Sequence, residues 1–208
     1  MKDCKNVKLI PILGTGLQKY DINDEDAAGP KNSMHVFNTE IWPKISHLFE
    51  NDSVVVDAGC GNGRISASLS EYCKKVIAID PFREPNKRNI RENIQFINTT
   101  IQDLNLGFKV DIFYLHGVFY LMGSWSTDAA FGKMVEDLKD DGLMIIIDDP
   151  VRDSLKPPPW APGFYSLRFL CQKWGCQVID DFVVPSGGLR TTVIKKAVTR
   201  TSAAQEAK

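Results

Sequence analysis

The residues whose types and spacing could carry chemistry lie within residues 54–64, which read Val-Val-Val-Asp-Ala-Gly-Cys-Gly-Asn-Gly-Arg. An apolar, β-branched run there ends in a carboxylate, Asp57, and glycines follow at every second position. A second apolar run, residues 76–79, ends in another carboxylate, Asp80. A strand, a tight turn and the start of a helix are the parts from which open parallel sheets build a ligand crevice. We therefore expect a ligand site where these two runs end.

The spacing of the glycines distinguishes two classes of ligand. Dinucleotide sites favour G-x-G-x-x-G, with the pyrophosphate on the helix N-terminus. Here the glycines run G-x-G-x-G, and Asp57 stands two residues before the first. A carboxylate at that position would repel a pyrophosphate and attract a ligand that carries an ammonium and a sulfonium group. The remaining alternatives are another nucleotide-binding α/β protein or a coincidental glycine turn.

This pattern resembles the class I S-adenosylmethionine-dependent methyltransferases, whose motif is D/E-x-G-x-G-x-G with an acidic residue that closes the second strand. The resemblance covers roughly residues 51–197. It implies an enzyme that uses S-adenosylmethionine as its cofactor, without a metal. The reaction implied is transfer of a methyl group to an oxygen or nitrogen atom of a small-molecule acceptor.

The resemblance also assigns parts of the cofactor to positions in this chain. Asp57 would hold the glycine turn and face the methionine end, Arg64 would pair with the methionine carboxylate, and Asp80 would accept hydrogen bonds from both ribose hydroxyls. Residues 101–103 would hold adenine, through one apolar side chain and one amide or carboxylate. The full set of expected cofactor-binding residues is Asp57, Gly59, Cys60, Gly61, Gly63, Arg64, Asp80, Ile101, Gln102, Asp103 and His116. The plainer alternatives are a solvated helix start for Arg64 and a loop cap for Asp80.

Two residues at strand ends are candidates for a catalytic base. His116 follows the expected strand 111–115, where the resemblance places the methyl group, and its alternatives are a wall of the cofactor site or a packed histidine. Asp148 ends the expected strand 143–148 beside Asp149. Adjacent carboxylates raise the pKa of one of the pair, which suits a proton acceptor. The alternative is that one acid faces solvent and the other caps the loop.

The loop after these acids is stiff and aromatic. Residues 157–165 read Pro-Pro-Pro-Trp-Ala-Pro-Gly-Phe-Tyr. Such a loop over the strand ends would form a lid or a wall of the acceptor pocket. Trp125, in the loop after the fourth strand, could complete that pocket, and ordinary loop packing is the alternative.

Apolar runs and helical patterns alternate along the chain as in a Rossmann-like α/β fold. The expected strands are residues 53–57, 76–80, 94–98, 111–115, 143–148, 176–184 and 189–197. The expected helices are residues 33–49, which Pro43 kinks or divides, 64–74, 86–93, 127–139 and 165–174. Residues 185–188 read Pro-Ser-Gly-Gly, a hairpin signal. The prediction is a three-layer sandwich with a mostly parallel seven-stranded sheet and an antiparallel C-terminal hairpin strand, which is also the fold of the family.

The length and composition indicate one domain. The chain has 208 residues, of which 43% are hydrophobic and 25% charged, so it can bury a sizeable core. We expect an irregular segment over residues 1–32, a single methyltransferase domain over residues 33–198 and a disordered tail over residues 199–208.

The charge and the cysteines narrow the range of partners. A net charge of −1 gives no general attraction to nucleic acid or to an anionic membrane. The apolar run at residues 9–13 is interrupted by Pro11 and is too short to span a bilayer. Five cysteines without a C-x-x-C pair indicate reduced thiols, so we expect a cytoplasmic protein. The expected partner is a small-molecule or peptide acceptor, and the sequence does not indicate an oligomeric state.

Two other functions stay open. Residues 98–103 and the Gly-Arg-Ile at 63–65 are similar to protein N-terminal α-amine methyltransferases. That family, however, has an asparagine where Pro150 stands and a histidine where Leu121 stands, which puts a peptide substrate in doubt. The other alternative is a non-catalytic subunit that binds S-adenosylmethionine and supports a partner.

Overall fold

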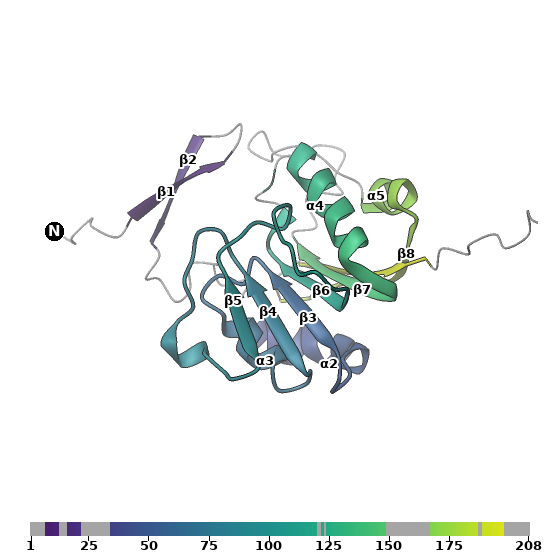
Figure 1. The fold of residues 1–208 in the computed structure, drawn as a ribbon, viewed down its shortest axis with the longest axis horizontal. Coiled ribbons are helices and arrows are strands. Elements are labelled where there is room, and N and C mark those ends of the chain that lie inside the picture. The colour runs from purple at the N-terminus through teal and green to yellow at the C-terminus, as the bar shows by residue number, and fades with distance from the viewer. Residues whose placement is uncertain are drawn as a thin grey trace, which may run out of the picture.

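The computed structural model describes residues 7–12, 16–21, 34–119, 122, 124–148, 167–186 and 189–197. Its main sheet has seven strands in the order β5-β4-β3-β6-β7-β9-β8 (Figure 1). They are β3 (Val54–Ala58), β4 (Lys75–Ile79), β5 (Ile94–Ile97), β6 (Val110–His116), β7 (Leu138–Asp148), β8 (Cys176–Val183) and β9 (Arg190–Lys196). Strands β3 to β7 are parallel, and β9 runs antiparallel to both β7 and β8. The predicted fold class is confirmed.

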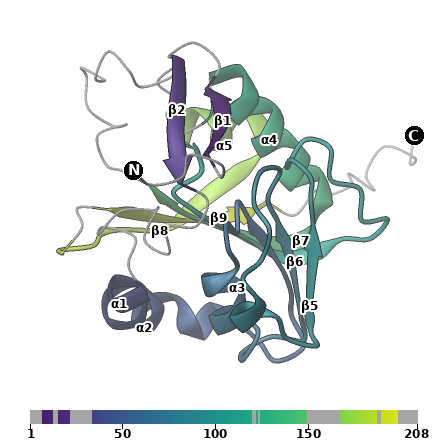
Figure 2. The same cartoon turned by 90° about the vertical axis from the view of Figure 1, so that its left-hand side faces the viewer.

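Helices cover both faces of the sheet, which makes three layers (Figure 2). One face carries the helical segment 34–48 and α3 (Arg64–Leu69). The other carries α4 (Ser124–Asp137) and α5 (Leu167–Trp174). The carboxyl ends of β3, β4, β6 and β7 therefore meet at one edge of the sheet, between the two helical layers.

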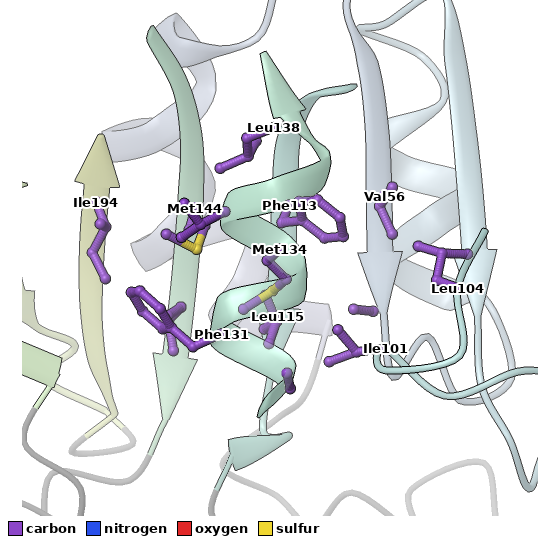
Figure 3. Packing of buried hydrophobic residues seen from close by; sticks show 14 of the residues in the cluster. Val56, Ile101, Leu104, Phe113, Leu115, Phe131, Met134, Leu138, Met144 and Ile194 are labelled. Carbon is purple, nitrogen blue, oxygen red and sulfur yellow. The ribbon is translucent and has the colours of Figure 1, made fainter. Parts of the chain in front are cut away.

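Alternation along each strand divides the apolar core between the two faces. On one face, Phe113 and Leu115 of β6 pack with Phe131 and Met134 of α4 (Figure 3). On the other face, Tyr114 packs edge-on against Phe37, with the ring centroids 6.3 Å apart. A parallel strand covered on both faces has apolar residues at nearly every position, and β6 has this pattern.

The helical segment around Pro43 is continuous but changes its winding. It consists of α1 (Met34–Val36), a π-helical turn η3 (Phe37–Ile41), α2 (Trp42–Ile45) and a 3₁₀ turn η4 (Ser46–Leu48). Proline has no N–H for an intrahelical bond and crowds the preceding turn. The widened turn lies directly before Pro43, where the amide of Trp42 donates to the carbonyl of Phe37. The expected helix is thus present, and the proline is accommodated by a local π turn.

Two expected helices are shorter than their patterns indicated. Helix α3 ends at Leu69 instead of near residue 74, and Tyr72, which follows it, is 42% exposed. The polar segment 86–93 contains only one 3₁₀ turn, η5 (Lys87–Asn89). The Asn86 side chain accepts from the Arg88 amide at 3.0 Å, an arrangement that starts a turn without an apolar face to extend it.

The first 32 residues are not irregular throughout, so that expectation was wrong. Strands β1 (Val7–Ile12) and β2 (Gly16–Asp21) form an antiparallel pair. Other expectations fall outside the described residues: Asp149, the aromatic loop 157–165, the tail 199–208 and the side chain of Trp125. Within the described part of the chain, no helix is long and apolar enough to cross a membrane.

Candidate cofactor-binding and active site

The glycine turn is fixed to the end of the neighbouring strand. The amides of Gly59 and Cys60 both donate to the carbonyl of Ile79, the last residue of β4, at 2.8 and 3.0 Å. The amide of Gly63 then donates to the carbonyl of Cys60 at 2.9 Å, and Gly63 caps the start of α3. The turn therefore lies over the carboxyl ends of β3 and β4, where the sequence predicted a ligand crevice.

The three glycines have different reasons to lack a side chain. All three have positive φ, 77° at Gly59, 58° at Gly61 and 83° at Gly63. A Cβ on Gly59 would lie 2.5 Å from Val118 Cγ2, and one on Gly63 would lie 2.8 Å from Phe96 Cε1. A Cβ on Gly61 would meet only the Arg83 side chain, at 3.7 Å. Two of the glycines thus serve packing within the protein, and only Gly61 has room on its Cβ side.

Asp80 holds this turn to the loop after β4. Its Oδ2 accepts from the amide of Gly61 at 3.0 Å, and its Oδ1 accepts from the amides of Phe82 and Arg83 at 2.8 and 2.9 Å. A carboxylate has about four acceptor positions. Backbone amides use three of them, so the carboxylate has about one position left for a ligand donor, fewer than two ribose hydroxyls require.

Asp57 is a buried carboxylate with one strong internal donor. Its side chain is 2% exposed, and its Oδ2 accepts from Ser66 Oγ of α3 at 2.5 Å. Burial raises the pKa of Asp57 to about 7, with a further increase from the Asp80 carboxylate, while the Ser66 hydrogen bond opposes both. A cation bound near this carboxylate would favour its ionised form.

Cys60 contributes its backbone to the turn. Burial, followed by the carboxylates of Asp57 and Asp80, raises the pKa of the Cys60 thiol. The nucleophilic form of cysteine is the thiolate. Cys60 therefore shapes the turn through its amide and is not a nucleophile.

His116 ends β6 on the same face as Asp57. Asp57 and Tyr114 are register partners across β3 and β6, and His116 follows Tyr114 by two residues. The Tyr114 hydroxyl lies 3.2 Å from His116 Nδ1. Burial lowers the pKa of His116 to about 4, and the positive charge of Arg64 lowers it further. The imidazole is therefore neutral at pH 7 and close enough to Arg64 to be affected by its charge.

Comparison with known proteins agrees with this fold. A family model described as a methyltransferase domain matches residues 56–146. A protein of Saccharomyces cerevisiae described as a probable S-adenosylmethionine-dependent methyltransferase is 37% identical over 59 aligned residues, which cover 24% of this chain and 20% of that protein. The chain thus matches only one fifth of that relative's length.

Solved structures share the fold at low sequence identity. The N-methyltransferase NodS from Bradyrhizobium japonicum, in complex with S-adenosylhomocysteine, has a TM-score of 0.63 at 14% identity, over 84% of this chain and 94% of that chain. The 1,6-didemethyltoxoflavin-N1-methyltransferase from Burkholderia thailandensis has a TM-score of 0.61 at 18% identity, over 79% of this chain and 82% of that chain. Over residues 56–146 the chain is similar to a methyltransferase domain, and it shares its fold with these methyltransferases.

The segment expected to hold adenine is hydrogen-bonded within the protein itself. Ile101 is 5% exposed and belongs to the core cluster under α4. The side-chain amide of Gln102 donates to the carbonyl of Ser126 at 3.0 Å, and Asp103 Oδ2 accepts from Thr100 Oγ1 at 2.7 Å. The amide of Asp103 also donates to Thr100 Oγ1 at 3.1 Å. The segment is a fixed turn, and the adenine contacts stay a prediction.

The two candidate bases lie on opposite faces of the sheet. His116 pairs in register with Ile147, which belongs to the cluster around Tyr114. Asp148 is the next residue along β7, and successive side chains of a strand point to opposite faces. Asp148, 8% exposed, therefore lies on the α4 face. The structure places His116 with Asp57 and Arg64 and does not bring Asp148 to the same face.

Two residues of the site were missed from the sequence. Ser66 binds Asp57, and Tyr114 binds His116. For Tyr114 a signal existed, because residues two apart on a strand share a face. For Ser66 no signal existed, because its partner depends on how α3 docks against β3.

Proposed function

We propose that this chain transfers the methyl group of S-adenosylmethionine to a nitrogen or oxygen atom of a small-molecule acceptor. The single observation that carries the proposal is the position of the glycine turn. The turn is hydrogen-bonded to the carbonyl of Ile79, and the carboxylates of Asp57 and Asp80 lie on either side of it. A dinucleotide pyrophosphate would meet two acids there, whereas a cationic ligand with free hydroxyls suits both.

The residues present fit this cofactor. Asp57 would offer a buried negative charge to the cationic end, and a cationic partner there would favour its ionised form near pH 7. Asp80 would accept from a ribose hydroxyl with the position that the backbone leaves open. Arg64, at the start of α3, would hold the methionine carboxylate. Gly61 would let the turn approach the ligand, since its Cβ side has room.

The sulfonium of the cofactor supplies an already activated methyl group. What the protein must add is alignment of the acceptor and exclusion of water. The edge of the sheet between the helical layers, beside His116, is where this alignment would occur. Two similar structures carry the name of N-methyltransferases, which supports nitrogen as one acceptor atom.

Calorimetry with S-adenosylmethionine and S-adenosylhomocysteine tests the cofactor site. We expect both to bind the wild-type protein, and we expect Gly61→Val to abolish binding in a variant that still unfolds cooperatively. Glu84→Ala, which removes an exposed acid from the loop after β4, is the matched control and should bind normally. Normal binding by Gly61→Val would contradict the cofactor site.

The acceptor class is tested with methyl-labelled cofactor. The purified protein is incubated with a fraction of small metabolites in one arm and with peptides bearing free α-amines in another. Label in the first arm supports the proposal, and label only in the peptides identifies an N-terminal amine methyltransferase instead. Tight binding of the cofactor with no label in either arm would indicate a non-catalytic subunit.

A further inference from the structure

A serine of α3 is hydrogen-bonded to the buried acid of β3. Ser66 is 0% exposed, and its Oγ donates to Asp57 Oδ2 at 2.5 Å. This distance is at the short end of the range for a hydroxyl that donates to a carboxylate. The backbone amide of Ser66, in the first turn of α3, also acts on this carboxylate. Asp57 therefore interacts with two donors of one residue.

The surroundings of Ser66 direct its hydroxyl toward this acid. A serine inside a helix can instead donate to the carbonyl four residues earlier, which here belongs to Asn62. That carbonyl already accepts from the Asn86 amide at 2.9 Å and from Asn89 Nδ2 at 2.8 Å. A carbonyl oxygen has two acceptor positions, and both are used. Among the described residues, the hydroxyl of Ser66 thus has one acceptor, the carboxylate of Asp57.

The other groups around the carboxylate favour its protonated form. Burial raises the pKa of Asp57 to about 7, and the Asp80 carboxylate raises it further, whereas the hydroxyl and the amide of Ser66 lower it. The pKa values of the Cys60 thiol in the glycine turn and of the Tyr114 phenol on β6 are both raised, so both groups are neutral at pH 7.

Two more ionisable groups lie near this face. His116 on β6, whose pKa is lowered to about 4 by burial, is neutral at pH 7. Arg64 is the one charged residue of α3. Neither acts strongly enough on Asp57 to count among the main causes of its shifted pKa, and the Ser66 donors do.

We propose that Ser66 is a positioning residue that acts through Asp57, because its hydroxyl orients the buried carboxylate at the glycine turn and keeps it charged for a cationic ligand near neutral pH. Ser66 thereby sets the lowest pH at which the cofactor binds tightly. This consequence for binding rests on the proposed function, in which the cationic end of S-adenosylmethionine is the partner of Asp57.

Carbon-13 NMR of the ligand-free protein tests the charge of the carboxyl group, and Asp57→Asn assigns its signal. We expect Ser66→Ala to move the titration midpoint of Asp57 upward by about one pH unit, the effect of one lost hydrogen bond to a charged group. Ser66→Thr keeps the hydroxyl and should restore most of this shift. Ser70→Ala is the matched control, since it removes a buried hydroxyl that donates to the Ala67 carbonyl at 2.7 Å. It should leave the titration unchanged.

An Asp57 titration that is the same in Ser66→Ala and in the wild type would overturn the inference. So would an equal shift in Ser70→Ala, because loss of any buried hydroxyl near α3 would then have the same effect. Neither measurement involves the cofactor, so both remain valid if the proposed methyl transfer fails.

Calorimetry with S-adenosylmethionine at pH 7 and pH 9 tests the effect on binding. With a midpoint of about 7 in the wild type and one unit higher in Ser66→Ala, the charged fraction of Asp57 at pH 7 falls from about one half to about one tenth. The variant should therefore bind about fivefold more weakly than the wild type at pH 7 and within about twofold of it at pH 9. The ratio of the two proteins at each pH cancels the titration of the ligand itself.

Equal weakening of Ser66→Ala at both pH values would overturn the inference, because a purely structural role does not depend on the charge of Asp57. Failure of the wild type to bind at either pH would instead count against the proposed function. The NMR titration would then still decide whether Ser66 controls the charge of Asp57.

Discussion

The carboxylate of Asp80 accepts a hydrogen bond from the amide of Gly61 at 3.0 Å, although 19 residues separate the two along the chain. The acid expected to bind ribose is therefore also part of the scaffold of the glycine turn. Any variant of Asp80 changes the cofactor contact and the shape of the turn together. The predictions below separate these two contributions.

Asp80→Ala should weaken binding of S-adenosylmethionine by about 1–3 kcal/mol and also lower the free energy of unfolding by a similar amount. The reason is that three backbone amides lose their acceptor along with the ligand. Asp80→Asn keeps one acceptor oxygen and should lose less of both. Calorimetry and chemical denaturation measure the two effects, with Glu84→Ala as the neutral control. If the Asp80→Ala protein were destabilised but bound the cofactor with wild-type affinity, Asp80 would support the glycine turn without contributing to cofactor binding.

Alanine at the first two glycines of the turn should give opposite phenotypes. Gly61→Ala should fold with a loss of about 1–2 kcal/mol for its positive φ and should lose most of its cofactor affinity. Gly59→Ala should lose about 2–4 kcal/mol of stability, because its Cβ would also overlap Val118. Thermal unfolding and calorimetry on the same two samples distinguish them. The assignment of Gly61 to the ligand side would be wrong if its alanine variant bound normally.

Cofactor affinity should depend on pH through Asp57. The carboxyl is protonated below its pKa of about 7, and a cationic ligand favours the ionised form. Affinity should therefore fall as the pH is lowered below 7, by at most about tenfold per pH unit, with release of a proton on binding. Calorimetry in buffers of different ionisation enthalpy counts that proton. His116 titrates near pH 4, outside this window. Asp57→Asn should remove the pH dependence of cofactor affinity. A wild-type affinity that stays constant from pH 5.5 to 8 would contradict this prediction.

The same carboxylate should destabilise the free protein at neutral pH. Its folded pKa, about 7, lies above the unfolded value of 3.8, so stability is greatest below pH 4 and is lost as the pH rises through 7. Asp57→Asn should therefore raise the free energy of unfolding at pH 8, by an amount on the order of 3 kcal/mol, and should change little at pH 4. Denaturation at both pH values measures this. A variant that is less stable at pH 8 would show that the Ser66 hydrogen bond outweighs the burial of the charge.

Much of the fold could be predicted because its signals are local. The buried strands are apolar runs bounded by polar residues or glycines, and the C-terminal hairpin is marked by residues 185–188. The segment 86–93 was predicted wrongly as a helix because its polar residues have no apolar face, and helices in proteins depend on packing such a face. The N-terminal pair β1–β2 lies in the segment 1–32 that was expected to be irregular, so it was not predicted.

The candidate site could be predicted as far as its strand ends, and no further. Which of two strand-end residues faces which helical layer depends on the register between strands, and a shift of one residue reverses it. For this reason the sequence suggested that His116 and Asp148 could serve one site, and the pairing of His116 with Ile147 separates them. The hydrogen bond between Thr100 and Asp103, by contrast, joins two residues at a sequence spacing that is common in turns. It could therefore have been predicted from the sequence.

The position of β9 between β7 and β8 has a consequence for synthesis on the ribosome. Strand β8 is made before β9, yet its neighbour in the sheet is β9, which begins at Arg190. Until β9 leaves the exit tunnel, β7 presents an open edge and β8 has no strand to pair with in the described sheet. Open edges of this kind attract other chains. A nascent chain halted before residue 190 should therefore depend on a chaperone, although all of its expected cofactor-binding residues have already been made.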